Sequence, residues 1–470
     1  MSSHLTQKPA PLSGKKVFFE TLGCQMNKSD SELMLGLLNQ QGFELAESER
    51  DADLLVINTC QIRGSAEDKA YSYLGRWKKL KRSRPGLKIA MTGCVSQQTK
   101  DGVFNRAPYV DIVIGTQNIH QLPDLVNQAF AGEHNLLAVD RQKERNTFDY
   151  VSDITPRRES DILAWVSIIE GCDYFCTYCV VPYTRGRQIS REPESILREV
   201  NELASMGFKE VTLLGQTVDA YGKDFKDREV KNKDYGLAEL LYELNEIPQL
   251  ERIRFMTSHP LDLSDKIIDA VASLPKVMEY IHIPMQSGDN TILERMRRGY
   301  TREEYFALVD KLYERIPGVS ISGDFIVGFP GETEEQFQRS LEAIERAQMV
   351  LVNVAAYSPR KQTPAGIWEE RGEGVIPDDV KQDRLQRLNA EVKRIAESKN
   401  TQLLGQTVEV LVEGKSKRNE NRLTGRTRNN KVVNFDSPFS EDELLGRCVN
   451  VKVLETTAWS LLGEHVDNSP

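Results

Sequence analysis

The sequence predicts an α/β protein in three parts: a parallel α/β N-terminal domain, a partial (β/α)6 barrel and a small C-terminal β-barrel. Over residues 15–135, short apolar runs alternate with stretches of helical spacing, and the same alternation returns on a larger scale from 164 to 359. Residues 402–464 instead carry short strand-like runs separated by turn residues, which favours a small β-barrel. A length of 470 residues fits about three domains.

Changes in composition place the domain boundaries. The stretch 141–160 is polar and has no apolar period, so it is interpreted as part of an interdomain linker. We expect a flexible leader over 1–14, the N-terminal domain over 15–135, the linker over 136–160, the partial barrel over 161–400, the small β-barrel over 401–464 and a tail over 465–470.

Composition excludes several classes of protein. The chain has no apolar run of about 18 residues, so no membrane contact is expected. Its first residues lack the apolar core of a secretory signal. Seven cysteines, an odd number, then indicate a reducing compartment, and we expect a cytoplasmic protein. The net charge of −9 argues against non-specific nucleic-acid binding but allows local basic surfaces.

The N-terminal domain places three cysteines just past predicted strands. Cys24 follows VFFETLG, Cys60 follows LLVINT and Cys94 follows KIAMTG. The carboxyl ends of parallel strands share one sheet edge, where ligands bind, so these cysteines are expected to converge. The alternative is three unrelated core cysteines. Strands are predicted at 16–22, 53–57, 87–91 and 110–114, and helices at 29–40, 64–80 and 119–130.

Two polar stretches of this domain have competing interpretations. Asp30 and Glu32 invite a catalytic role, but the order Ser29-x-x-Glu32 favours a capping box at a helix start. The basic run 77–88 (WKKLKRSRPGLK) is either a solvated helix end or a contact for phosphate, and the sequence leaves both open.

The chain is organised around a second group of thiols. Cys172, Cys176 and Cys179 are spaced CxxxCxxC directly after an apolar run. Three thiolates on one loop fit an iron–sulfur site in which one iron of a cubane cluster stays open for a substrate or cofactor. The alternative is a disulfide or zinc staple, but pairing leaves one thiol over and no nearby histidine completes a zinc site.

The partial barrel places polar motifs at the ends of its predicted strands, where barrel enzymes carry their chemistry. His259, before Pro260, is interpreted as a turn residue because no second histidine stands at ligand spacing. Thr333 and Gln336 form a capping box. Strands are expected at 164–170, 210–215, 252–257, 280–285, 321–327 and 351–357, followed by a polar helix over 377–401.

The C-terminal part carries a one-sided basic stretch, GKSKRNENRLTGRTRNNK. Basic residues on loops of a small barrel favour binding of a phosphate backbone, and a merely solvated hairpin is the alternative. Cys448, in an apolar strand, is expected in the core. The candidate RNA-binding residues are Lys415, Lys417, Arg418, Arg422, Arg426 and Arg428.

Taken together, these motifs resemble the methylthiotransferases of the radical S-adenosylmethionine (SAM) superfamily, and within it the MiaB-type tRNA enzymes. The resemblance covers residues 15 to 464 and implies a methylthiotransferase domain, a radical SAM barrel and a TRAM domain. Its motifs are TLGCQMNKSDSE, INTCQIRGSAEDK, MTGCVSQ, IEGCDYFCTYCVVPYTRGR, LLGQTVDAYG, RFMTSHP, HIPMQSGDN, RRGYTREEY, DFIVGFPGETEEQF and YSPRKQTPA. Thr217 and Asp219 depart from the pattern, which more often has asparagines at these positions.

The resemblance implies two [4Fe–4S] clusters. Cys172, Cys176 and Cys179 match the ligands of the cluster that binds SAM, and Cys24, Cys60 and Cys94 match those of an auxiliary cluster. It also implies a SAM site in which Tyr178 lies against the adenine, Gly215 and Gln216 near the methionine end and Gln286 near the ribose, with Gly328 as a further SAM-binding residue.

The implied reaction is methylthiolation of C2 of N6-isopentenyladenosine beside the anticodon, at position 37 of tRNA. A radical from SAM would abstract the hydrogen at C2, and sulfur at the auxiliary cluster would join that carbon. The implied partners are the tRNA anticodon arm and a reductant such as flavodoxin or ferredoxin, and a monomer is expected. Alternatives are a methylthiotransferase acting on threonylcarbamoyl-adenosine or on a ribosomal protein, and, outside enzymes, an RNA-binding module stabilised by metal.

Overall fold

The computed structural model describes residues 12–61, 64–140, 156, 158, 160–228 and 233–467. Most of the expected leader and linker, at 1–11 and 141–155, lies outside the described residues, as does the end of the expected tail at 468–470. The described residues fold into two units. The N-terminal unit comprises those up to 158 together with 170–173 and 179–189, and the C-terminal unit comprises 160–169, 174–178 and the described residues from 190 to 467.

The N-terminal unit contains a wholly parallel sheet with strand order β2-β1-β3-β4-β5-β6. The central strands β3 and β4 are buried along their entire length, as expected for strands covered on both faces. The strands are β1 (Lys16–Thr21), β2 (Glu44–Leu45), β3 (Leu54–Thr59), β4 (Lys88–Gly93), β5 (Ile112–Ile114) and β6 (Leu136–Ala138). The sequence predicted β1, β3, β4 and β5 and missed the edge strands β2 and β6.

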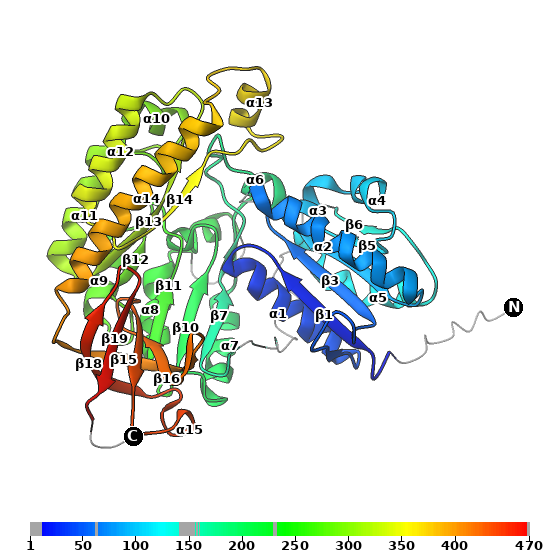
Figure 1. Ribbon diagram of the computed structural model, residues 1–470, viewed down its shortest axis with the longest axis horizontal. Coiled ribbons are helices and arrows are strands. Elements are labelled where there is room, and N and C mark those ends of the chain that lie inside the picture. Colours follow the sequence, from blue (N-terminus) through cyan, green and yellow to red (C-terminus); the bar gives the residue numbers. More distant parts are fainter. Residues whose placement is uncertain are drawn as a thin grey trace, which may run out of the picture. The chain divides into compact units, whose positions relative to one another are not determined.

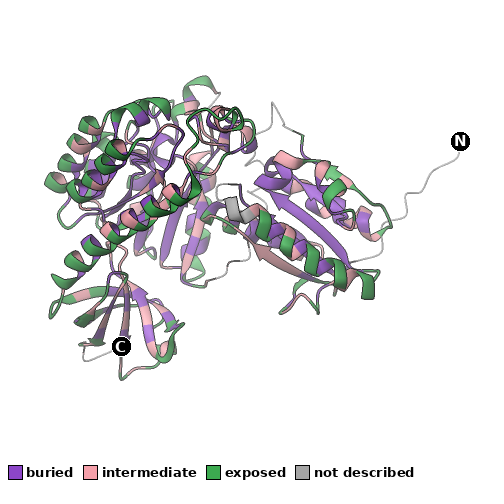
Figure 2. Cartoon of the chain, turned by 45° about the horizontal axis from the view of Figure 1, so that its top comes forward, coloured by how far each residue is buried: buried purple, intermediate pink, exposed green. Residues whose placement is uncertain are grey.

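Two apolar clusters cover the two faces of this sheet. One is built on α1 and α5 and includes Met34 and Val126, and the other is built on α2 to α4 and includes Trp77 and Val95. Figure 2 shows the buried strands of this sheet between helices whose outer faces are exposed. The helices are α1 (Gln25–Gln40), α2 (Gly64–Ser83), α3 (Cys94–Thr99), α4 (Gly102–Arg106) and α5 (Leu122–Phe130), with a 3-10 turn, η1, at Thr116–Gln121.

A segment distant in sequence completes the N-terminal unit. Residues 179–189, with the short helix α6 (Val181–Thr184), pack against η1. The Thr116 hydroxyl donates to the carbonyl oxygen of Thr184 (2.8 Å), and the Gln117 amide donates to that of Arg185 (3.1 Å). Strands β8 (Ile169–Glu170) and β9 (Ile189–Ser190) mark where the chain passes between the units.

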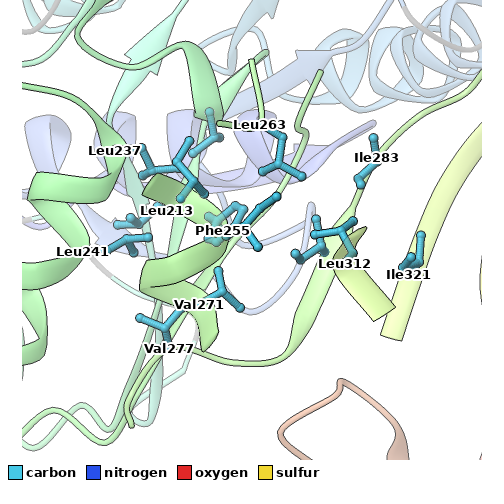
Figure 3. Packing of buried hydrophobic residues seen from close by; sticks show 14 of the residues in the cluster. Leu213, Leu237, Leu241, Phe255, Leu263, Val271, Val277, Ile283, Leu312 and Ile321 are labelled. Atoms are coloured by element: carbon cyan, nitrogen blue, oxygen red, sulfur yellow. The ribbon is translucent and has the colours of Figure 1, made fainter. Parts of the chain in front are cut away.

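The C-terminal unit begins with an arc of six parallel strands in chain order, as predicted. They form two sheets, β11-β10-β7 and β12-β13-β14, joined by a parallel bridge between Ile253 and Val277. One large apolar cluster, part of which Figure 3 shows around Phe255, fills the space between strands and helices. The strands are β7 (Leu163–Ser167), β10 (Glu210–Leu214), β11 (Arg252–Phe255), β12 (Tyr280–His282), β13 (Ser320–Val327) and β14 (Leu351–Ala356).

Helices follow the strands and cover the arc (Figure 1). Several begin with a side-chain cap, and the capping box predicted at Thr333 and Gln336 is present at the start of α12. The helices are α7 (Pro193–Ser205), α8 (Leu237–Asn245), α9 (Asp265–Ser273), α10 (Asn290–Arg295), α11 (Arg302–Arg315), α12 (Glu334–Ala347), α13 (Pro364–Glu370) and α14 (Asp378–Thr401), with 3-10 turns η3 (Val218–Ala220) and η4 (Lys223–Asp227).

The C-terminal residues form a closed barrel with strand order β15-β16-β17-β19-β18. Most of the basic stretch that the sequence assigned to loops is strand, because β15 and β16 form a long hairpin. Cys448 is exposed at the start of β18, so its expected place in the core was wrong. The strands are β15 (Thr407–Ser416), β16 (Asn419–Arg426), β17 (Val432–Asp436), β18 (Cys448–Thr456) and β19 (Ser460–His465), with helix α15 at Glu441–Leu444.

This small barrel is attached to the amino-terminal ends of the arc's strands. Arg252 and Arg254, in β11, donate to the carbonyl oxygens of Arg426 (2.7 Å) and Arg428 (2.7 Å). Both arginines are almost fully buried. Their Nη atoms bond the small barrel, while Nε of Arg254 donates to Glu210 in β10 (2.8 Å). Within the part of the chain that the structure describes, no helix is both long and apolar enough to cross a membrane.

Candidate metal and cofactor sites

Three cysteines lie where three neighbouring strands of the N-terminal sheet end. Cys24 is the residue before α1, Cys60 directly follows β3, and Cys94 opens α3 after β4. Because β1, β3 and β4 are adjacent and parallel, the structure brings all three to one edge. The pKa of Cys24 is lowered to about 6, chiefly by a hydrogen bond from the Cys60 thiol and also by the charge of Arg185 and the Asn27 amide, while burial acts in the opposite direction. Burial raises the pKa of Cys94.

Two glycines allow the segments that carry these thiols to pack closely together. A Cβ atom on Gly23 would stand 2.2 Å from Cβ of Cys60, and one on Gly93 would stand 2.3 Å from the carbonyl oxygen of Thr59. Both glycines also have positive φ angles, +121° and +89°. Any side chain at either position would therefore displace the strand end that carries Cys60.

The donor set at this edge fits an iron–sulfur cluster. All seven cysteines are free thiols, and sulfur is the donor that iron–sulfur clusters use. Within the described ranges, no three Cys, His, Asp or Glu side chains already stand as a closed metal-binding group. The thiols at the strand ends would therefore have to rotate toward a shared cluster.

The capping box expected at Ser29 and Glu32 was wrong, because α1 begins four residues earlier and Cys24 holds the capping position. Asp30 and Glu32 lie inside the helix, and each pairs with an arginine. Asp30 bonds Arg185 (2.5 Å) and Glu32 bonds Arg158 (2.9 Å). The sequence missed both pairs, since the partners lie more than a hundred residues away.

Arg185 is the central charge of this edge. Its guanidinium bonds Asp30, Glu170 (3.1 Å) and the side-chain oxygen of Asn27 (3.4 Å). Asn27 in turn lies 3.6 Å from the Cys24 sulfur and accepts its thiol hydrogen. The buried network thus connects the segment that follows Cys179 with the first cysteine of the chain.

The CxxxCxxC loop is divided between the two units. Cys172 and Cys179 belong to the N-terminal unit, where the Cys172 amide donates to the carbonyl oxygen of Gly186 (3.2 Å). Cys176 belongs to the C-terminal unit, where its sulfur accepts a bond from Arg298 (3.5 Å). Arg298, in the RRGYT motif, is buried. Like Arg185, it was not singled out as a functional residue from the sequence.

Five predicted SAM contacts all lie in the C-terminal unit. Tyr178 packs against a small apolar cluster that includes Phe329. Gly215 follows β10, and a Cβ there would stand 2.1 Å from Cγ2 of Ile169. Gln286 adopts a positive φ of +75° beside β13, and Gly328 ends β13 with a φ of +68°. Gln216 follows Gly215 in the same turn.

A polar cluster past the end of β11 was missed by sequence reasoning. His259, read as a turn residue, is buried and stacks on Tyr174 with ring centroids 3.7 Å apart. The Tyr174 hydroxyl donates to Asp262 (2.7 Å), and Asp219 accepts the His259 amide (2.8 Å). Burial lowers the pKa of His259 to about 2, so the imidazole is neutral at physiological pH. The sequence signals were the two aromatic residues between the first two cysteines of the loop and the RFMTSHP motif that contains His259.

The six candidate RNA-binding residues differ in how far their charges are already used. Lys415, Arg422 and Arg426 pair with Glu441 (3.7 Å), Asp436 (3.0 Å) and Glu413 (3.3 Å). Arg428 pairs with Glu279, beside β12.

Lys417 and Arg418, at the exposed turn between β15 and β16, carry no ion pair among those found in the described part of the chain. The hairpin therefore presents its unpaired charge at its tip.

In the basic run 77–88, several side chains are directed into the fold. Trp77 is fully buried, Lys81 donates to Asp111 and to the carbonyl oxygen of Tyr109 (2.9 Å), and Lys88 is buried in β4. Fewer positive charges of this run are therefore available to bind phosphate than the sequence indicated.

Comparison with known sequences finds three family models in chain order. They are described as Uncharacterized protein family UPF0004 (residues 16–115), Radical SAM superfamily (166–344) and TRAM domain (401–466). Curated relatives called tRNA-2-methylthio-N(6)-dimethylallyladenosine synthase match over nearly the whole chain. The protein from Halalkalibacterium halodurans is 45% identical over 97% of this chain and 82% of its own. That from Thermoanaerobacter pseudethanolicus is 43% identical over 97% and 94%.

Among solved structures, the radical S-adenosylmethionine methyltransferase TsrM from Kitasatospora setae, with cobalamin and a [4Fe-4S] cluster bound, has a similar fold. The TM-score is 0.51 at 15% identity, over 75% of this chain and 74% of that chain. At this identity the likeness concerns the fold alone.

Proposed function

The chain belongs to the family of tRNA-2-methylthio-N(6)-dimethylallyladenosine synthases, and we propose that its six motif cysteines serve that reaction as two separate iron–sulfur sites. The protein is a radical SAM methylthiotransferase that modifies N6-isopentenyladenosine in tRNA. The target carbon is C2 of the adenine beside the anticodon, at position 37. One observation carries the two-site proposal: Cys24, Cys60 and Cys94 stand on three adjacent strand ends, separate in sequence from the CxxxCxxC loop.

The N-terminal edge would hold the auxiliary [4Fe–4S] cluster through Cys24, Cys60 and Cys94, and the CxxxCxxC loop would hold the other through Cys172, Cys176 and Cys179. When bound, the clusters and SAM supply one-electron chemistry, the sulfur atom and the methyl group. The chain itself would supply three thiolates at each site. One iron of each cluster would then have no ligand from these cysteines.

The SAM-binding residues would act by position. Tyr178 would lie against the adenine, and the packing of its ring on the Phe329 cluster limits where it can move. Gly215 and Gln286 would place main chain near the ligand. Gly215 packs against Ile169, where a Cβ would not fit, and Gln286 adopts a left-handed conformation. Gln216 and Gly328 would complete the site at the ends of β10 and β13.

The RNA would reach the protein with its target base out of the stack, since chemistry at C2 is impossible inside stacked RNA. Lys417 and Arg418 would make the first contacts with the phosphates of the anticodon arm. Lys415, Arg422, Arg426 and Arg428 would contribute through whatever charge their carboxylate partners leave. A small reductant such as flavodoxin or ferredoxin would supply electrons. We propose a monomer that works in the cytoplasm.

The test separates the two cysteine sites. The triple variant C24A/C60A/C94A should still cleave SAM but should no longer methylthiolate tRNA. The variant C448A, which removes the exposed cysteine, is the matched control and should keep both activities. Methylthiolation by the triple variant would overturn the two-site assignment.

Two further measurements distinguish the alternatives. Anaerobic reconstitution should give about eight irons and eight sulfides per chain, from two cubane clusters, whereas an RNA-binding module stabilised by metal would take up one or two zinc ions. In tRNA from a deletion strain, mass spectrometry of nucleosides should show loss of the methylthio group from isopentenyladenosine alone. Loss from threonylcarbamoyl-adenosine would indicate the other tRNA enzyme.

A further inference from the structure

We propose that Arg185 is a positioning residue of the N-terminal cysteine site, and that its buried positive charge, opposed by Asp30 and Glu170, sets the reduction potential of the cluster held there. The inference rests on the proposed assignment of Cys24, Cys60 and Cys94 as cluster ligands. It assigns a function to the ion pairs of Arg185, none of which includes a cysteine of the site.

The geometry of Arg185 is that of a fixed charge. Its side chain is 3% exposed, and those of its partners Asp30 and Glu170 are 13% and 10% exposed. Nη2 lies 2.5 Å from the Asp30 carboxylate and Nη1 lies 3.1 Å from that of Glu170. The Gln117 amide holds the main-chain carbonyl of Arg185. Arg185 is therefore fixed both at its guanidinium group and at its main-chain carbonyl.

Arg185 also lies close enough to the thiols to act on them. Its Nη2 shares the side-chain oxygen of Asn27 with the Cys24 thiol, at 3.4 and 3.6 Å. Asn27 thus links the guanidinium of Arg185 to the first cysteine of the site.

The physical consequence follows from charge. Reduction adds one negative charge to a cluster, and a buried cation nearby stabilises that charge more than it would in water. Local charge and hydrogen bonding are among the levers by which a protein tunes iron–sulfur potentials. Removing the cation should make the cluster harder to reduce, and removing one of the opposed anions should make it easier.

A purely structural ion pair gives a different expectation. If Arg185 only holds segment 179–189 to the sheet, loss of either partner loosens the same contact, and both losses should shift the potential in the same direction or not at all. Opposite shifts distinguish electrostatic tuning from scaffolding. Arg187 supplies a matched control, because it stands two residues away, is 70% exposed and pairs with Asp173.

The experiment uses the full chain carrying C172A/C176A/C179A, so that bound iron belongs to the N-terminal site. After anaerobic reconstitution, the midpoint potential is measured by titration followed with electron paramagnetic resonance. We expect R185Q to shift the midpoint to a more negative value and D30N to a more positive value, while R187Q leaves it unchanged. R185K, which keeps the charge, should stay closer to the parent than R185Q.

The outcomes separate the two levels of inference. Failure of the C172A/C176A/C179A chain to bind iron would refute the cluster assignment itself. Normal iron and sulfide content with equal potentials, or with shifts of one sign, would refute the role of Arg185. Should R185Q not fold, E170Q takes its place beside D30N: both remove an anion, so both must shift the midpoint upward, and a downward shift in either contradicts the proposal.

Discussion

The guanidinium of Arg428, just past β16, lies 2.7 Å from the carboxylate of Glu279, just before β12. The same side chain donates to the carbonyl oxygens of Pro275 (2.9 Å) and Val277 (3.2 Å). Arg428 therefore attaches the small barrel to the strand arc. We expect R428A to lower the free energy of unfolding by about 1–3 kcal/mol, because it leaves partly buried acceptors unsatisfied. Urea denaturation measures this, with K417A as the unaffected control.

The tip of the β15–β16 hairpin is the part of the small barrel where we expect RNA to bind most strongly. Lys417 and Arg418 are exposed, and replacing both by alanine should weaken tRNA binding and reduce the slope of log Kd against log salt by roughly 1.5. R422Q should have a smaller effect, since Arg422 already pairs with Asp436. Fluorescence anisotropy over a range of KCl concentrations gives the slopes. Equal slopes for K417A/R418A and the parent would exclude a phosphate contact at the tip.

Asp219 stands where the MiaB-type pattern more often has an asparagine, and its surroundings allow it to act as an asparagine would. Burial, and then the charge of Asp262, raises the pKa of Asp219 well above its usual range, and its carboxyl accepts the buried amide of His259. A neutral acid and an amide can make the same bond. D219N should therefore keep stability and activity close to the parent, whereas D219A should cost about 1–3 kcal/mol by leaving that amide unpaired. Thermal unfolding with a parallel activity assay tests both.

Glu332 predicts a pH dependence of stability. Burial raises its pKa from 4.5 to about 7, although the Gly328 amide and Arg384 act in the opposite direction. A raised pKa means that the folded state binds the proton more tightly than the unfolded state, so this contribution to stability is complete below about pH 4.5 and is lost as pH rises to about 7.

Compared with E332Q, the parent should lose stability over this window and run parallel to it above pH 7.5. Urea denaturation at a series of pH values measures the difference between the two proteins. An identical pH profile for E332Q would show that Glu332 does not titrate in this range.

The fold was predictable where local pattern decides it. The apolar runs that became β3 and β4 are fully buried, so every position carries the signal, and Cys60 and Cys94 could be placed at strand ends. Short edge strands such as β2, with both residues exposed, left no such trace. The start of α1 was misplaced because Ser29 and Glu32 satisfy the capping pattern, while the side chain of the true cap, Cys24, accepts no capping bond from the helix.

The cysteines and glycines of the candidate sites could be predicted from the sequence, but the ion pairs and hydrogen bonds around them could not. Cysteine spacing is a local property, whereas the partners of Asp30 and Cys176 are Arg185 and Arg298, more than a hundred residues away. A single sequence does not pair distant arginines with their acceptors. For the same reason the attachment of the small barrel to the strand arc was not predicted. Arg428 was predicted to be free to bind RNA, whereas it pairs with the distant Glu279.

The packing of segment 179–189 on the N-terminal sheet has a consequence for dividing the protein into fragments. A fragment ending at residue 160 would leave Thr116 and Gln117 without their carbonyl acceptors and Asp30 without its cation. Such a fragment should aggregate or bind iron poorly even though its sheet is complete. The independent folding unit is discontinuous along the gene, so a faithful excision would require 179–189 to be supplied in trans or fused by a designed linker.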